Sequence, residues 1–154
     1  ILSGNKALAT DYIAGINMLS NMRLCSNVPG QAIIQTALGG YQSVNEYLMP
    51  GGRIYEQREY IYNALNDIPG LSAVKPKAAF YIFPKMDTKK FNILDDEKFA
   101  LDLLKEKKVL ITHGKGFNWG EPDHFRIVYL PSVEELRKAT GKLRDFFAGY
   151  HQKL

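Results

Sequence analysis

The chain has 154 residues and a formal net charge of +4, with 45% hydrophobic and 23% charged side chains. This is the composition of an ordinary folded domain, and it excludes collagen-like, low-complexity and disordered proteins. No apolar run approaches the roughly 20 residues that cross a bilayer, and the N-terminus lacks the pattern of a signal peptide. We therefore expect a cytoplasmic protein that has no membrane partner.

Three helices are predicted in the first 50 residues, after a strand end at residues 1–4. In residues 7–22 apolar side chains recur at steps of four, four and three, which predicts a helix with one apolar stripe. A second helix, over residues 26–40, is apolar on nearly all sides, so we expect it to be buried, with another subunit as one candidate neighbour. Ser43 and Glu46 have the spacing of a capping box and predict a short third helix.

Alternating helices and strands are predicted after MPGGR at residues 49–53, which we take as the boundary between two domains, 1–50 and 51–154. The expected helices cover residues 54–67, 94–108 and 132–151, and the expected strands cover residues 71–75, 79–83, 109–112 and 123–131. Asp95 and the Ser132/Glu135 pair are the predicted caps of the second and third of these helices. Together these elements predict an α/β fold with a three- or four-stranded sheet covered on one side by helices, about 100 residues in size.

The surplus of positive charge does not indicate a nucleic-acid partner. The lysines are dispersed or lie near predicted helix ends, where cations interact favourably with the helix dipole. Lys85, Lys89 and Lys90 are expected in a polar loop, and no nucleic-acid recognition module is visible. We therefore interpret the excess of lysine as a solvated surface.

The sequence shows no complete catalytic motif. His113, His124 and His151 are too scattered to form a metal-ligand pattern, so no metal site is predicted. No nucleophile elbow or phosphate-binding loop is present. Cys25 has no second thiol with which to form a disulfide, and we interpret it as a small core residue. Taken alone, the chain is expected to be catalytically incomplete.

Arg126 is the most informative residue, because it lies in an otherwise apolar predicted strand, DHFRIVYLP. A guanidinium stays charged at physiological pH and is rarely buried without an anionic partner. One interpretation is a surface ion pair with a glutamate, and the other is bidentate binding of a small carboxylate or phosphate. The preceding loop favours binding, since it combines glycine backbone with aromatic side chains, namely Gly114, Gly116, Phe117 and Trp119.

Three segments in a fixed order make the chain resemble a known family. AFYIFP at 79–84, VLITHGKGF at 109–117 and HFRIVYLP at 124–131 are similar to the C-terminal region of class I/II aminotransferases, the pyridoxal-phosphate enzymes of fold type I. The segments NMRLCSNVPGQAIIQTALGGYQS and GFNWGEPDHFRIV most resemble the bacterial alanine (glutamate–pyruvate) branch, with aspartate-type enzymes as near relatives. The resemblance covers essentially the whole chain.

The resemblance implies roles for residues of the predicted second domain. In this family an arginine of the small domain binds the substrate α-carboxylate, and Arg126 occupies the matching position. Phe80, in the family's GAFY segment, is a possible wall of the substrate pocket. The family's loop usually reads P-G-x-x-F, and here His113 replaces the proline while Gly114 and Phe117 match.

The resemblance also implies what this chain lacks. The lysine that forms the Schiff base with pyridoxal 5'-phosphate, and an arginine that holds its phosphate, lie in the family just upstream of a strand ending like ILSG. We therefore expect a C-terminal fragment that is inactive alone, with residues 1–50 ending the large cofactor-binding domain and 51–154 forming the small domain. Neither Lys6 nor Lys115 is assigned as the attachment lysine. The implied parent enzyme is a homodimer that moves an amino group between an amino acid and a 2-oxo acid.

Two other functions are compatible with the residues considered alone. The first is a self-contained α/β module in which Arg126 binds a carboxylate ligand or an acidic partner without catalysis. The second is a basic nucleic-acid binder, which would show salt-sensitive binding to an arbitrary duplex because phosphate contacts release counterions.

Overall fold

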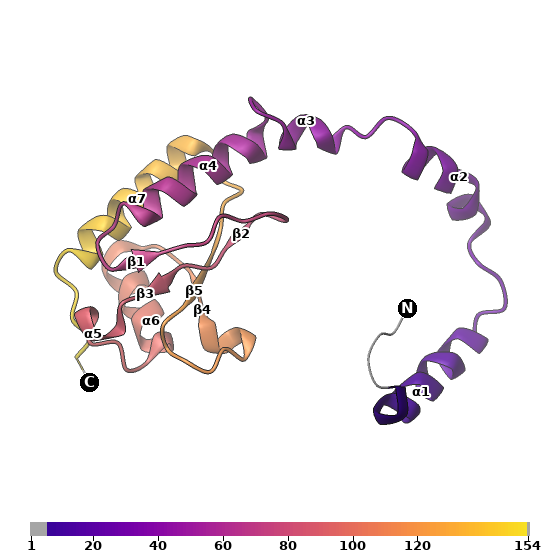
Figure 1. Ribbon diagram of the computed structural model, residues 1–154, viewed down its shortest axis with the longest axis horizontal. Helices are drawn as coiled ribbons and strands as arrows, with labels where there is room; N and C mark the ends of the chain where they lie inside the picture. Colours follow the sequence, from indigo (N-terminus) through magenta and orange to yellow (C-terminus); the bar gives the residue numbers. More distant parts are fainter. Residues whose placement is uncertain (1–5, 154) are drawn as a thin grey trace. The chain divides into compact units, whose positions relative to one another are not determined.

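The computed structural model describes residues 6–153, which belong to two units, residues 1–43 and 44–154 (Figure 1). The strand end expected at residues 1–4 and the side chain of Lys6 lie outside what is described. The boundary between the units falls seven residues before the predicted domain boundary at residue 50, which stays a prediction.

The first unit is helical. It contains a short 3-10 helix, η1 (Lys6–Ala9), followed by α1 (Thr10–Asn21) and α2 (Val28–Gly39), which confirms two predicted helices. Asn27 caps α2 by accepting a hydrogen bond from the backbone N–H of Gly30 at 3.3 Å.

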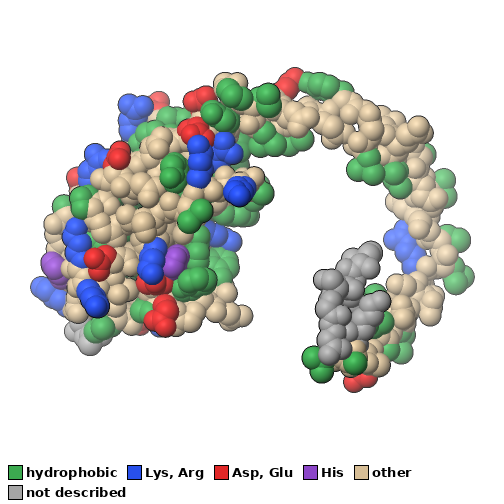
Figure 2. Space-filling view, in the orientation of Figure 1, with side chains coloured by type: hydrophobic (Ala, Val, Ile, Leu, Met, Phe, Trp, Pro, Cys, Tyr) green, Lys and Arg blue, Asp and Glu red, His purple; other side chains and the backbone are tan. Residues whose placement is uncertain are grey.

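The predicted burial of the second helix is not found among the described residues of this chain, and its burial against another subunit stays a prediction. None of the residues of α1 or α2 is buried, and Cys25 is exposed rather than in a core. Apolar side chains are accordingly visible on the surface of this unit (Figure 2). The physical reason is that the described part of this unit contains no further element against which these helices could bury an apolar face.

The second unit contains the sheets and the core. Its helices are α3 (Val44–Leu48), α4 (Arg53–Asn66), α5 (Thr88–Phe91), α6 (Asp96–Lys107), the 3-10 helix η2 (Gly114–Phe117) and α7 (Val133–Phe147). Its strands are β1 (Leu71–Ser72), β2 (Tyr81–Ile82), β3 (Lys85–Met86), β4 (Thr112–His113) and β5 (Phe125–Val128). The mixed α/β fold class expected from the sequence is confirmed.

Two small antiparallel sheets are formed. The first has three strands in the order β2-β5-β4, with Ile82 opposite Ile127 and Thr112 opposite Arg126. The second pairs β1 with β3. The expected strand at residues 71–75 thus begins at Leu71 but lies outside the three-stranded sheet, because it pairs with a strand that the sequence did not predict.

Helices and strands of the second unit enclose one hydrophobic core. Helix α7 packs against α4 and α6, and α4 and α7 run side by side in Figure 1. The centre of the core is formed by the most deeply buried side chains of four elements, Ile61 and Leu65 of α4, Phe99 and Leu103 of α6, Phe125 of β5 and Leu143 of α7. The core therefore holds β5, the strand that carries Arg126, against three helices.

The predicted caps of α6 and α7 are confirmed, whereas the Ser43/Glu46 capping box stays a prediction. Asp95 accepts hydrogen bonds from the N–H groups of Glu97 and Lys98 at the start of α6. Ser132 and Glu135 form a reciprocal capping box at the start of α7.

Two local expectations are corrected. Lys85 lies in β3 rather than in a polar loop. Lys89 and Lys90 lie in α5, because the Asp87 side chain accepts hydrogen bonds from the backbone N–H groups of both. The strand predicted at residues 109–112 is displaced and occupies Thr112–His113.

Within residues 6–153 no helix is long and apolar enough to span a membrane.

Candidate functional site

Arg126 lies on the strand in the middle of the three-stranded sheet. Successive side chains of a strand point to opposite faces, so Arg126 and Val128 face away from the core that buries Phe125. Val128 is paired with Tyr81 of β2, which places the Tyr81 ring on the same face as the arginine. The strand predicted from DHFRIVYLP is confirmed, and its alternation explains how it accommodates a cation.

The guanidinium of Arg126 lies over two aromatic rings. Its Cζ atom is 4.6 Å from the ring centroid of Tyr81 and 4.3 Å from that of Phe117. Rings at these distances interact favourably with the cation through their quadrupoles, but they supply no negative charge.

No described carboxylate neutralises Arg126. Its Nε atom is buried and has no hydrogen-bond partner, and none of the ion pairs formed by the described residues includes this side chain. The surface ion pair considered from the sequence is therefore not formed here. A half-buried guanidinium with an unused donor and two aromatic walls is suited to bind a small planar anion, above all a carboxylate.

The loop that supplies Phe117 passes close to the backbone of β5. The N–H of Gly114 donates a hydrogen bond to the carbonyl oxygen of His124 at 2.9 Å, and a Cβ atom at position 114 would lie only 2.8 Å from that oxygen. Glycine is therefore required at this crossing. His113, which replaces the family's usual proline, has φ −71°, a value that proline also adopts, so the replacement keeps the backbone direction.

A polar and aromatic cluster holds the far side of the same loop. Asp123 accepts hydrogen bonds from Trp119 Nε1 at 2.8 Å and pairs with His124 Nδ1 at 2.6 Å, while the Lys85 ammonium lies 3.3 Å away. The Phe83 ring stacks on the His124 ring at 4.8 Å. Trp119, expected as an aromatic wall of the site, is thus part of the support of the loop, and Phe117 is the aromatic side chain of this loop that contacts Arg126.

The Asp123 carboxyl is electrostatically stabilised in its ionised form. Burial by itself raises its pKa, but the hydrogen bonds from His124 and Trp119, together with the charge of His124 and the hydrogen bond from Lys85, outweigh burial and lower the pKa below its usual value. This carboxylate therefore stays charged in the folded protein at neutral pH.

Phe80 and Tyr81 have different environments. Phe80 packs against the hydrophobic core, and its ring centroid lies 4.7 Å from that of Tyr81. The role of Phe80 as a pocket wall stays a prediction. Sequence reasoning missed Tyr81, and the signal that could have identified it is the strand alternation that places Tyr81, and not Phe80, opposite Val128.

A hollow of about 450 Å³ lies between the β4–β5 pair and α7, and Arg126 is part of its lining. Most of its other lining side chains are aliphatic, including Leu110, Ile127, Leu136 and Ala139. Its volume is within the range of small-molecule sites, but its lining is mainly core-facing, whereas the Arg126 guanidinium lies with Tyr81 and Phe117 on the other face of β5.

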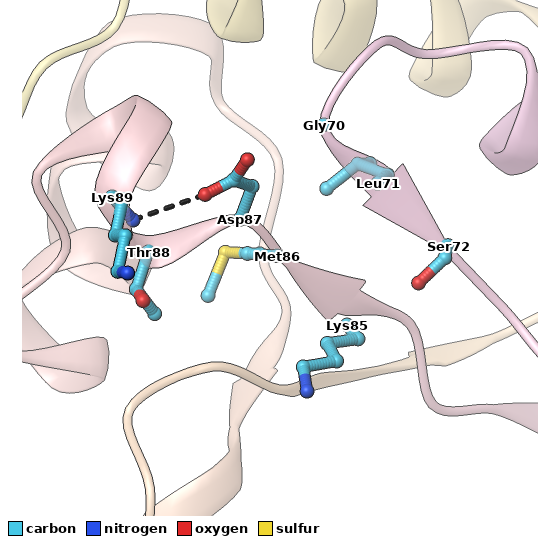
Figure 3. A pocket seen from close by; sticks show the side chains of 8 residues that line it. All are labelled: Gly70, Leu71, Ser72, Lys85, Met86, Asp87, Thr88 and Lys89. Atoms are coloured by element: carbon cyan, nitrogen blue, oxygen red, sulfur yellow. Dashed lines mark hydrogen bonds between the residues drawn. The ribbon is translucent and has the colours of Figure 1, made fainter.

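A second hollow, of about 430 Å³, lies beside the β1–β3 pair (Figure 3). Two of its charged side chains, Asp87 and Lys85, already have partners. Asp87 accepts the N–H of Lys89 at 3.1 Å, the interaction drawn in Figure 3, and Lys85 pairs with Asp123. This hollow therefore offers less unused binding capacity than the surroundings of Arg126. Among the described residues no group of three or more His, Cys, Asp or Glu side chains is arranged to hold a metal ion.

Comparison with known proteins identifies the family. The sequence model of the family described as aminotransferase class I and II matches residues 4–143. The chain belongs to the class I and II aminotransferases.

The relatives within this family are similar over nearly all of the chain. It is 59% identical over 152 residues to a glutamate-pyruvate aminotransferase of Haemophilus influenzae and 55% identical over 152 residues to one of Escherichia coli. Each alignment covers 99% of this chain and 38% of the relative, so the chain spans less than two fifths of their length. A crystal structure of an aminotransferase from Escherichia coli superposes with a TM-score of 0.83 at 55% identity and covers the same shares, 99% and 38%.

Proposed function

We propose that this chain forms the C-terminal part of a pyridoxal-phosphate-dependent aminotransferase, in which Arg126 binds the α-carboxylate of the substrate. The observation that carries the proposal is the unpaired guanidinium, whose buried Nε has no partner and whose faces lie against Tyr81 and Phe117. A substrate carboxylate would supply the missing negative charge. Family membership gives the reaction class, transfer of an amino group between an amino acid and a 2-oxo acid.

Arg126 would act by positioning. The planar fork of a guanidinium donates two parallel hydrogen bonds to a carboxylate and thereby binds it in one orientation. Two aromatic rings restrict the rotation of that fork, so the carboxylate would be held in a defined direction relative to the reacting Cα atom. The names of the relatives favour alanine, aspartate or glutamate as amino donors, with pyruvate as one acceptor.

The described residues do not fit covalent attachment of the cofactor. None of the lysines whose side chains are described is buried, and Lys115 instead forms ion pairs with Asp95 and Asp96. We therefore place the attachment lysine and the phosphate site in a part of the protein outside this chain, and no catalytic residue is assigned here.

The proposal also covers the domains, the oligomeric state and the location of the complete enzyme. Residues 1–50 would complete the large domain and residues 51–154 would form the small domain. Helix α3, which lies at the end of residues 1–50, packs against α4 of the small domain. A homodimer in the cytoplasm is the proposed state of the complete enzyme. Phe80 is retained as a candidate pocket wall, with Tyr81 and Phe117 added to it.

The test is substitution of Arg126 in the complete enzyme. Arg126→Ala should lower kcat/KM for alanine and pyruvate by an amount equivalent to about 2–5 kcal/mol, because a charged pairing in a desolvated site is lost. Arg137→Ala is the matched control, since Arg137 also lies over a tyrosine ring, that of Tyr60, but on α7. Steady-state kinetics with both substrates is the measurement.

The outcomes separate the proposal from its alternative. Unchanged kinetics for Arg126→Ala would remove this residue from the substrate site. Saturable binding of pyruvate by the complete protein, without turnover in the presence of pyridoxal phosphate, would instead favour a non-catalytic binding module.

A further inference from the structure

Helix α6 carries a buried carboxylate that does not cap the helix. Asp96 is fully buried, with 0% exposure. The cap of α6 is provided by its neighbour Asp95, so the carboxylate of Asp96 is not needed for capping. Burial of a charge without partners is costly, so its contacts indicate what it stabilises.

Every contact of this carboxylate that the structure gives is with the loop before Phe117. Asp96 Oδ2 accepts a hydrogen bond from the backbone N–H of Lys115 at 2.8 Å, and the Lys115 ammonium lies 3.5 Å from Oδ1. His113 Nδ1 is 3.7 Å from Oδ2. The carboxylate therefore faces the two residues that flank Gly114, the glycine that crosses β5.

The contacted residues belong to two elements of the Arg126 site, His113 to β4 and Lys115 to η2. On one side, β4 pairs Thr112 with Arg126 itself. On the other side, η2 starts at Gly114 and ends at Phe117, whose ring covers the guanidinium at 4.3 Å. Lys115 and Phe117 thus belong to the same short helix, two residues apart.

We propose that Asp96 is a positioning residue, which fixes η2 so that Phe117 covers Arg126 and holds its guanidinium in the orientation that receives a substrate carboxylate. The part of this inference that concerns substrate rests on the proposed function. The part that concerns the loop does not, because it depends only on the contacts of Asp96 with His113 and Lys115.

The experiment compares Asp96→Ala and Asp96→Asn in the complete enzyme, with Glu97→Gln as control. Glu97 is the next residue of the same helix and is exposed. In Asp96→Ala the Lys115 amide loses its acceptor, so hydrogen exchange in the peptide covering residues 113–119, followed by mass spectrometry, should be about tenfold faster or more. Asp96→Asn keeps a carbonyl acceptor and should lie between wild type and Asp96→Ala. Glu97→Gln should exchange like wild type.

The kinetic readout distinguishes positioning from a loss of general stability. The KM for pyruvate should rise about tenfold in Asp96→Ala, the consequence of one lost hydrogen bond of typical strength. Turnover of an amine that lacks the α-carboxylate should stay at the wild-type rate, because such a substrate makes no use of Arg126. Equal losses with both substrates would indicate a structural role only and would overturn the inference.

Two further outcomes are decisive. If hydrogen exchange at residues 113–119 and the KM for pyruvate are both unchanged in Asp96→Ala, Asp96 does not position the loop. If Asp96→Ala does not fold, Phe117→Leu replaces it, and an unchanged KM for pyruvate in Phe117→Leu would overturn the inference. Failure of the proposed function is recognised separately, because Arg126→Ala would then leave kinetics unchanged while the exchange result for Asp96 stands.

Discussion

Gln152 is a buried amide whose hydrogen bonds join the end of the described chain to the start of α6. Its side-chain oxygen accepts from the N–H groups of Leu94 and Asp95 at 2.7 and 2.9 Å, and its amide donates to the Asp95 carbonyl at 2.6 Å. The side chain is 2% exposed. It therefore satisfies three backbone groups that water reaches poorly.

Removal of this amide should be costly. Gln152→Ala is expected to lower the free energy of unfolding by about 3 kcal/mol, because buried backbone donors and an acceptor lose their partner. The measurement is urea denaturation, with the exposed neighbour in His151→Ala as control. A loss as small as that of the control would show that water replaces the amide.

Ionisation of Asp123 should make the stability of the fold depend on pH. Because its folded pKa is lowered, its ionisation stabilises the folded state fully at pH values above the unfolded pKa of about 4, and this contribution is lost as the pH falls through the folded pKa. The stability difference between wild type and Asp123→Asn should therefore shrink as the pH falls from 7 to below 4.

Urea denaturation at a series of pH values is the measurement for Asp123. Asp67→Asn, at the exposed end of α4, controls for removal of a surface carboxylate. A difference between wild type and Asp123→Asn that does not change between neutral and acidic pH would contradict the prediction.

At the scale of elements, the helices follow from their caps and apolar faces. Helix α7 buries Leu136, Leu143, Phe146 and Phe147, and the sequence predicted this helix and its capping box. The strands were less predictable, because β1 to β4 have two residues each and exist through pairing with distant segments. Strand β3 and helix α5 were missed for the same reason, since a two-residue strand and a one-turn helix carry no periodic pattern.

The capping box of α7 can be tested as an element. Ser132→Ala should lower the free energy of unfolding by about 1 kcal/mol, because the N–H of Glu135 loses its acceptor at the start of a helix that packs on the core. Ser132→Thr keeps a hydroxyl oxygen and should retain most of the stability. Thermal or urea unfolding of both variants is the measurement, and equal losses in the two would rule out the cap as the cause.

At the scale of the whole molecule, the two units differ in how far their apolar side chains are buried. Residues 44–154 contain the buried core, whereas η1 and α2 leave large apolar side chains exposed, such as Leu8 at 87% and Leu38 at 80%. The chain also covers only 38% of the length of its glutamate-pyruvate relatives. The candidate site accordingly includes Arg126 and its aromatic support but no residue assigned to catalysis.

The sequence by itself determined the α/β class, the capped helices, the family and the strand in which a charged arginine requires an anion. These features depend on local spacing or on the order of segments along the chain, which can be read without coordinates. Only the tertiary structure decided that Tyr81 and Phe117 enclose Arg126 and that Asp96 holds the loop through Lys115, 19 residues away. Such contacts are set by how β2, β5, α6 and η2 pack together, and the packing of segments distant in sequence leaves no periodic signal in any one of them.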